Sequence, residues 1–220
     1  MSKKKANILL MLRKSDPFSK KLANYIKKKF NGTKIIWSSK PSERNKIPAS
    51  LKVDFIFAFR SYYILNKKDL LKTKFSAINF HPGPPNFRGF GCTNFALFKN
   101  SKHYGVTSHI INKKIDSGKI INVKYFKITK TDNLDKLLKK THRYLYNQAK
   151  RLIPLIIKDP AILIKLIKKN KKINWSKKLY KKKDLENLYL IKKNLNKKKI
   201  DRIIRATYLK NSKFNPKFVD

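Results

Sequence analysis

The chain has 220 residues, of which 41% are hydrophobic and 12% aromatic, so it can bury one substantial core but hardly two. The formal net charge of +44 would favour a nucleic-acid partner, yet only eight of the 56 basic residues are arginine, the residue type that favours bidentate phosphate and base contacts. We therefore expect no nucleic acid and attribute the lysine excess chiefly to drift in an AT-rich genome, with a real preference for polyanions as the alternative.

The cysteine content and the apolar runs exclude further classes of protein. A single cysteine, Cys92, allows neither an internal disulfide framework nor a cysteine-based zinc site, and we expect no bound metal. The apolar run at residues 8–12 is shorter than a signal-peptide core, and no stretch approaches the roughly 20 apolar residues that span a bilayer. These patterns predict a soluble, cytoplasmic protein without membrane contact.

The first 80 residues alternate short apolar runs with amphipathic stretches. The predicted strands cover residues 6–12, 34–37, 53–59 and 75–80. A helix is expected from the Ser15-Asp16-Pro17 start signal to about residue 29, and a shorter one over residues 65–71. This alternation predicts an α/β fold with a mostly parallel sheet covered by helices.

The remaining chain predicts a hairpin, a long helix and a basic tail. After a helix over residues 93–98, residues 104–111 and 119–125 alternate like two paired strands. Apolar residues then recur at helical spacing from 134 to 152, which predicts a helix that ends near Pro154. Lysine dominates from residue 168, so we interpret 1–167 as the main domain and 168–220 as a short C-terminal appendage, with a last strand over 203–208.

Polar side chains close the strand predicted over residues 75–80. Asn79 and His81 are two residues apart, so both project from one face at the carboxyl end of the strand, where open α/β sheets bind ligands. The loop Pro82-Gly83-Pro84-Pro85 has little conformational freedom and can hold the imidazole in one pose. Asp116, in a predicted turn, can approach His81, orient it and raise the pKa of its imidazole.

Four separated sequence blocks carry a resemblance to a known family. They are residues 78–85 (Ile-Asn-Phe-His-Pro-Gly-Pro-Pro), 87–89 (Phe-Arg-Gly), 105–107 (Gly-Val-Thr) and 115–118 (Ile-Asp-Ser-Gly). In this order they closely resemble the 10-formyltetrahydrofolate-dependent formyltransferases. The resemblance implies a Rossmann-like formyltransferase fold, a catalytic domain over residues 1–167, and Asn79, His81 and Asp116 as catalytic residues.

Those three side chains suit formyl transfer to an amine. Attack of the amine on the formyl carbon creates an oxyanion that an amide and an imidazolium can stabilise, while a proton passes from the attacking nitrogen to the leaving one. Asp116 can orient the imidazole and join the proton path through water. The reaction needs neither a metal nor a covalent nucleophile.

The resemblance also implies binding residues. The co-substrate 10-formyltetrahydrofolate is expected to lie along the segment after the strand at 53–59, and the expected lining residues are Arg60, Ser61, Tyr62, Ile64 and Leu65. An ordinary strand-to-helix loop is the alternative for each of them. The active-site loop implies substrate contacts from Pro84, Phe87, Arg88 and Gly89, where Arg88 either pairs with a phosphate or braces the loop.

The amino-acid residues within the motifs favour one subfamily. The loop at residues 82–85, Gly91-Cys92-Thr93-Asn94-Phe95-Ala96 and the tail element at 205–208 look like the nucleotide-sugar N-formyltransferases. The expected acceptor is therefore the primary amine of a nucleotide-linked amino-deoxysugar, of the dTDP-4-amino-4,6-dideoxyhexose type, for surface polysaccharide such as lipopolysaccharide O-antigen. The alternatives are a methionyl-tRNA formyltransferase-like enzyme that lacks the C-terminal barrel, and a noncatalytic RNA-binding protein.

The appendage is expected to serve assembly or substrate closing. Its apolar residues are too sparse for an independent core, so it must pack on the main domain or on another subunit, and a homodimer held by Trp175, Ile203, Ile204 and Tyr208 is the expectation. Trp175 and Tyr180 either stack on a nucleotide base or anchor the tail. The remaining histidines, 103, 109 and 142, are given a structural role by default.

Overall fold

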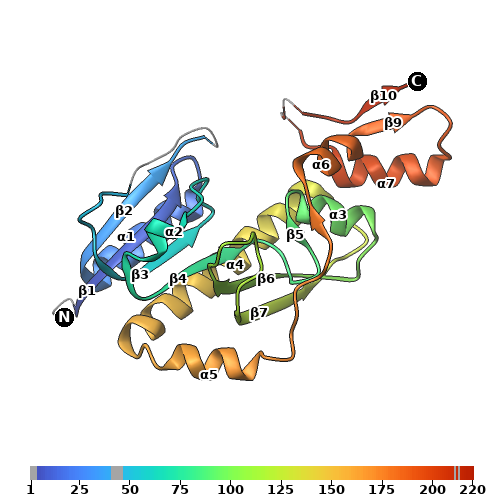
Figure 1. Ribbon diagram of the computed structural model, residues 1–220. Helices are drawn as coiled ribbons and strands as arrows, with labels where there is room; N and C mark the ends of the chain where they lie inside the picture. Colours follow the sequence, from blue (N-terminus) through green and yellow to red (C-terminus); the bar gives the residue numbers. More distant parts are fainter. Residues whose placement is uncertain (1–3, 41–46, 211, 213) are drawn as a thin grey trace.

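A six-stranded mixed sheet forms the centre of the protein in a computed structural model, which describes residues 4–40, 47–210, 212 and 214–220 (Figure 1). In order across the sheet, the strands are β2 (Phe30–Ser38), β1 (Lys4–Arg13), β3 (Val53–Phe59), β4 (Thr73–His81), β6 (His103–Ile110) and β7 (Ile120–Lys127). The first four run parallel, and β6 and β7 each pair antiparallel with the preceding strand. The predicted α/β class, the mostly parallel sheet and the β6–β7 hairpin are confirmed.

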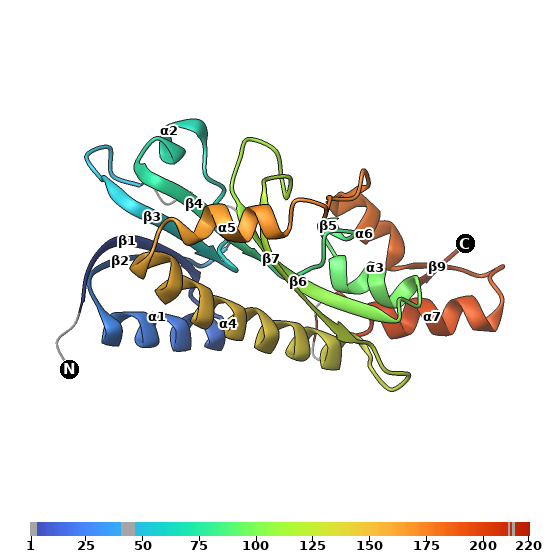
Figure 2. The same cartoon turned by 90° about the horizontal axis from the view of Figure 1, so that it is seen from below.

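Helices cover both faces of the parallel strands. Helices α1 (Pro17–Lys29) and α4 (Leu134–Lys158) lie along one face, and α2 (Lys67–Leu70) lies on the other (Figure 2). The side chains of β1 alternate between the two sides: Ile8, Leu10 and Leu12 belong to the larger apolar cluster, and Leu9 and Met11 to the smaller one. A strand buried on both faces needs such a continuous apolar run.

The predicted end of the long helix is wrong. Helix α4 does not end near Pro154 but continues to Lys158, with Ile153 and Ile156 fully buried in the core. Proline has a helical φ, and burial of this apolar face offsets the one backbone hydrogen bond that its missing N–H removes. The next helix, α5 (Ile162–Lys169), packs against the edge strand β7.

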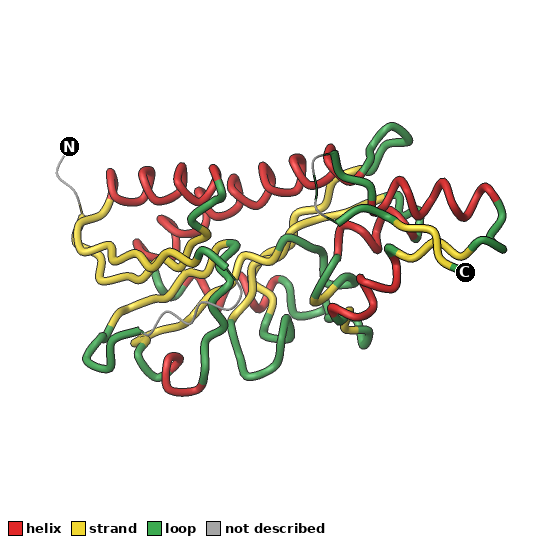
Figure 3. Tube along the Cα trace, turned by 90° about the horizontal axis from the view of Figure 1, so that it is seen from above, coloured by secondary structure: helices red, strands yellow, loops and turns green. Residues whose placement is uncertain are grey.

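The C-terminal segment folds over one end of the sheet, beyond α3 (Cys92–Phe98) (Figures 1 and 3). It contains β8 (Leu179–Tyr180), α6 (Lys182–Leu188), β9 (Leu190–Lys192), α7 (Lys197–Thr207) and β10 (Lys217–Val219). Residues 203–208, expected to form a strand, belong almost wholly to α7, which packs on α3. Ile200 and Ile203 are one turn apart on its inner face, and Asn196 caps the helix by accepting from the Lys199 N–H at 3.0 Å.

No helix in the described part of the chain has both the length and the apolar composition needed to cross a membrane.

Candidate active site

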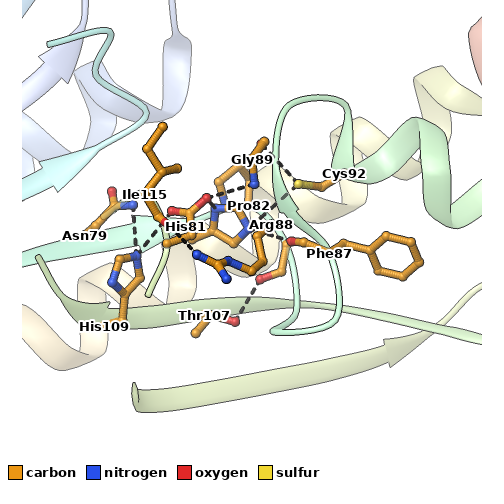
Figure 4. Close-up of polar contacts among 12 residues, drawn as sticks. Asn79, His81, Pro82, Phe87, Arg88, Gly89, Cys92, Thr107, His109 and Ile115 are labelled. Atoms are coloured by element: carbon orange, nitrogen blue, oxygen red, sulfur yellow. Dashed lines mark hydrogen bonds and ion pairs between the residues drawn. The ribbon is translucent and has the colours of Figure 1, made fainter. Parts of the chain in front are cut away.

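Strand β4 delivers two polar side chains to the edge of the parallel part of the sheet. Asn79 pairs in register with Ala58 of β3 on one side and with His109 of β6 on the other, and His81 pairs with Thr107. The Asn79 amide nitrogen lies 3.2 Å from His109 Nε2 (Figure 4). His109 Nδ1 lies 2.8 Å from the Ile110 carbonyl, which can only accept, so Nδ1 is the donor there and the other ring nitrogen, Nε2, faces the Asn79 amide.

The proline-rich loop holds His81 in one orientation. His81 Nε2 lies 2.9 Å from the Phe87 carbonyl (Figure 4). The Phe87 N–H in turn donates to the Pro84 carbonyl at 2.9 Å. Gly83 permits this closure, because a Cβ atom there would lie only 2.6 Å from His81 Nε2. Thr107 donates to the Gly83 carbonyl at 2.8 Å and ties the loop to β6.

The turn between β6 and β7 brings Asp116 to both histidines. Asp116 adopts a left-handed backbone conformation with φ 42°, and its carboxylate lies 3.4 Å from His81 Nδ1 and 3.5 Å from His109 Nε2. The Gly89 N–H donates to the same carboxylate at 3.0 Å. The structure therefore brings the three predicted catalytic residues, Asn79, His81 and Asp116, into one cluster through His109.

The protonation states of this cluster follow from burial and charge. Burial alone would raise the pKa of Asp116, but the two imidazoles and the Gly89 N–H outweigh it and hold the pKa well below its usual range. Burial lowers the pKa of His81, and the Asp116 carboxylate offsets only part of this effect. Asp116 thus raises the His81 pKa, as expected, but desolvation is the larger effect and the net shift of the pKa is downward. An ionised carboxylate beside a neutral imidazole results.

His109 and Trp175 also reach the cluster, and neither was predicted to. The ring centroids of Trp175 and His109 are 5.0 Å apart, and the Trp175 N–H donates to the Gly118 carbonyl at 2.8 Å. A signal for His109 was present, because it lies two residues after Thr107 on the same face of a predicted strand. No comparable signal exists for Trp175, which arrives from a segment 57 residues beyond Gly118.

The predicted substrate residues surround His81, partly through their backbones. The ring of Phe87 is buried in the core, so its carbonyl is the group that faces the histidine. The Arg88 guanidinium donates to the carbonyls of Ser176 at 3.0 Å and Ile115 at 2.6 Å, which is the bracing alternative. Pro84 is buried, and Gly89, at φ 86°, presents its N–H to Asp116. Contact of these four residues with a substrate remains a prediction.

The predicted cofactor residues leave the sheet next to the cluster. Arg60 follows β3 with φ 54° and lies 3.4 Å from Asp16, and burial lowers the pKa of its guanidinium to about 10. The Ser61 hydroxyl accepts from the Tyr63 N–H at 3.1 Å.

Of the other residues in that segment, Tyr62 and Leu65 pack against other side chains, whereas Ile64 is exposed. The Tyr62 ring lies under the Arg13 guanidinium at 3.9 Å. Leu65 is buried in the smaller apolar cluster, whereas Ile64 is 78% exposed. The segment thus presents one exposed apolar side chain, Ile64.

The single cysteine, Cys92, lies close to His81, with its Sγ 3.8 Å from His81 Nε2. Cys92 Sγ lies 3.2 Å from the Gly89 carbonyl, and burial raises the pKa of the thiol well above its usual range, so it stays protonated and is a poor nucleophile. Among the residues that the structure describes, no group of three or more His, Cys, Asp or Glu side chains is placed to hold a metal ion. The cluster itself offers an amide donor, a neutral imidazole and a carboxylate, which can polarise a carbonyl and move a proton.

Comparisons with known proteins find a family, a curated relative and solved structures that are similar to this chain. The profile of a family described as "Formyl transferase" matches residues 3–156. The chain is 32% identical over 148 residues to the bifunctional polymyxin resistance protein ArnA of Wigglesworthia glossinidia brevipalpis, a match that covers 57% of this chain and 22% of that protein. The chain therefore spans about a fifth of the length of this curated relative.

Solved structures share the fold across nearly the whole chain. A 4-N formyltransferase from Francisella tularensis has a TM-score of 0.71 at 20% identity, covering 99% of this chain and 93% of that one. An N-formyltransferase from Helicobacter canadensis, solved with folinic acid and dTDP-3-aminofucose, has a TM-score of 0.67 at 19% identity, covering 91% of this chain and 80% of that one.

Proposed function

Because the chain belongs to the formyl transferase family, we propose that it moves the formyl group of 10-formyltetrahydrofolate to the primary amine of a nucleotide-linked amino-deoxysugar, of the dTDP-4-amino-4,6-dideoxyhexose type. The observation that carries the proposal is the polar cluster at the end of β4, in which the Asp116 carboxylate lies 3.4 Å from His81 and 3.5 Å from His109, and Asn79 contacts His109. Such a cluster provides an oriented donor and an oriented base at the ligand-binding edge of an α/β sheet.

In the proposed reaction a C–N bond forms between the formyl carbon and the amine, and the C–N bond to the folate breaks. His81 takes the proton of the attacking nitrogen, because its imidazole is neutral and stands beside an ionised carboxylate. The resulting imidazolium donates from both ring nitrogens, to Asp116 and to the Phe87 carbonyl, and later returns the proton to the departing nitrogen. One Asn79 N–H is engaged with His109, and the second is available to the formyl oxygen as it gains charge.

We assign the folate to the segment that begins at Arg60. Since Ala58 of β3 pairs with Asn79, this segment leaves the sheet beside the proposed oxyanion donor. The exposed Ile64 offers an apolar surface for an aromatic ring, and the buried Leu65 fixes the turn that presents it. These features fit a pterin held by apolar packing and backbone groups.

The acceptor is proposed from the loop motifs and from a neighbour. The loop at residues 82–85 resembles the nucleotide-sugar subfamily, and the Helicobacter canadensis neighbour was solved with a dTDP-linked aminosugar. A methionyl-tRNA formyltransferase-like activity is the rival, favoured only by the net charge of +44. With a nucleotide-linked amino sugar as the acceptor, the formylated product serves surface polysaccharide synthesis.

The test is turnover on a panel of acceptors. Purified protein with 10-formyltetrahydrofolate should convert at least one dTDP- or UDP-linked amino-deoxysugar to its N-formyl derivative, detected by mass spectrometry, and should leave initiator methionyl-tRNA unchanged. His81→Asn and Asp116→Asn should each lower kcat at least ~100-fold, since oriented acid-base and oxyanion groups contribute that much. His103→Gln, a change of an exposed histidine on β6, is the matched control and should keep full activity. Formylation of the tRNA alone would overturn the sugar assignment.

A homodimer through the C-terminal segment is part of the proposal. Of the four residues expected to hold it, Ile203 is buried within the same chain and Trp175 packs on the active-site histidines. Ile204 and Tyr208 remain exposed, and two further apolar residues of the segment, Phe214 and Phe218, are exposed as well. These four side chains offer an apolar surface for a second copy.

A further inference from the structure

We propose that Trp175 is a positioning residue of the reaction, which closes the site over His81 and His109 and holds the turn that carries Asp116. The inference rests on the proposed formyl transfer and assigns to the C-terminal segment a part in it. It is carried by the contacts of one indole ring and by the hydrogen bonds and packing of the residues that follow it, 176–180.

The backbone around Trp175 is attached to the active-site loop. The Ser176 N–H donates to the Pro85 carbonyl at 2.9 Å, and the Ser176 carbonyl accepts from Arg88 at 3.0 Å. Farther along, β8 pairs in parallel with β5 (Arg88–Gly89), and the Phe90 N–H donates to the Tyr180 carbonyl at 2.9 Å. The loop that orients His81 and the segment that carries Trp175 are therefore one hydrogen-bonded unit.

Tyr180 anchors the far end of this unit in the core. Its ring is 4% exposed and stacks on Phe95 of α3 at a centroid distance of 3.9 Å, with Phe87 at 6.1 Å. A buried aromatic stack of this kind resists displacement, because its removal exposes a large apolar area. The indole five residues earlier is thus held by the anchors that follow it in the chain, at Ser176 and Tyr180.

The indole of Trp175 contacts three parts of the catalytic cluster at once. It meets His109 edge to face at 5.0 Å and 84°, and His81 at 5.8 Å and 73°. Its N–H donates to the Gly118 carbonyl at 2.8 Å, two residues after Asp116. Gly118 packs so tightly on the Ile110 carbonyl that a Cβ atom there would overlap it, so the turn has little freedom of its own.

These contacts exclude water from the imidazoles of His81 and His109 and restrain the orientation of both rings. An aromatic wall over the two rings keeps water away, and burial is the main cause of the lowered His81 pKa. The other groups that face His81 are Asp116 on the turn, Arg88 on β5, His109 on β6 and the protonated Cys92 thiol on α3. Loss of the indole should admit water around His81, so the His81 pKa should rise toward its ordinary value.

The experiment compares Trp175→Leu and Trp175→Phe, with Trp37→Phe on β2 as the matched tryptophan control. Trp175→Leu should lower kcat about 10- to 100-fold with a smaller change in KM, since small misplacements of reacting groups cost that much. The acidic limb of the kcat/KM profile should move to higher pH, because protonation of His81 removes the base. Trp175→Phe, which keeps an aromatic wall but loses the donor to Gly118, should fall between Trp175→Leu and the native protein.

A second readout does not depend on turnover. In protein with isotope-labelled histidine, NMR titration follows the four imidazoles, assigned by His81→Asn, and the His81 and His109 signals should lose their ring-current shifts in Trp175→Leu. If no acceptor is ever turned over, the proposed function fails while these spectra still judge the position of Trp175. Native-like imidazole signals, pH profile and kcat in both Trp175 variants, as expected for Trp37→Phe, would overturn the inference.

Discussion

Replacement of His142 by glutamine should make the protein more resistant to mild acid. His142 lies on α4, where burial, helped by the positive charges of Arg60 and Arg13 and opposed by Asp16, lowers the pKa of its imidazole to about 3. In the unfolded chain the imidazole titrates near 6.5. The folded state therefore keeps the ring neutral, and the stability present above pH 6.5 is lost as the pH falls from 6.5 toward the folded-state pKa.

The magnitude follows from the protons bound in each state. Below pH 6.5 the unfolded chain holds one more proton at this residue, so the free energy of unfolding falls by about 1.4 kcal/mol per pH unit. Between pH 7 and pH 5 the loss is about 2 kcal/mol, and it scarcely changes if the folded-state pKa lies about one unit higher. His142→Gln should remove this loss.

The assay is urea unfolding followed by circular dichroism at pH 7, 6 and 5. The native protein should lose about 2 kcal/mol more than His142→Gln across this range, while His81, whose pKa is also lowered, contributes equally to both. His103→Gln, on the exposed start of β6, should follow the native protein. The reasoning is refuted if His142→Gln loses stability as steeply as the native chain.

Three further predictions concern the site and the tail. Gly118→Ala should destabilise the protein and reduce activity, since its Cβ would overlap the Ile110 carbonyl, and a melting curve with unchanged midpoint would contradict this. Arg88→Lys cannot span the two carbonyls that Arg88 joins, so limited proteolysis should cleave the lysine-rich chain before Trp175 faster than in the native protein; equal rates would remove the bracing role. Phe218→Asp should convert the proposed dimer to a monomer in light scattering, and an unchanged mass would place the interface elsewhere.

The contacts made by the chain after residue 168 predict how a truncated protein would behave. Removal of the chain after residue 168 takes away the Ser176 contacts to Pro85 and Arg88, the β8 pairing and the indole over the histidines. Helix α3 also loses its cover, since Asn94 donates to the Ala206 carbonyl at 2.8 Å. The appendage is therefore continuous with the active-site loop, and a shortened chain is expected to lose the orientation of His81.

Much of the sheet could be predicted because its signals are local. A strand buried on both faces requires a continuous apolar run, and residues 53–59 supply one whatever their neighbours are. Asn79 and His81 share a face through the two-residue period of a strand, and Asp116 was found by its motif. In each case the deciding property lies within a few residues.

Tertiary structure decided whatever depends on a partner far along the chain. Residues 203–208 have the composition of a strand but form a helix, because Ile203 and Ala206 find an apolar surface on α3. His109 joins the cluster through its register with Asn79, and the direction of the His81 pKa depends on how completely the folded chain excludes water. Trp175 reaches the histidines through a segment anchored by its hydrogen bonds to Pro85 and Arg88 and by the burial of Tyr180 beside Phe95. Burial and register are properties of the assembled chain, so no local pattern of residues contains them.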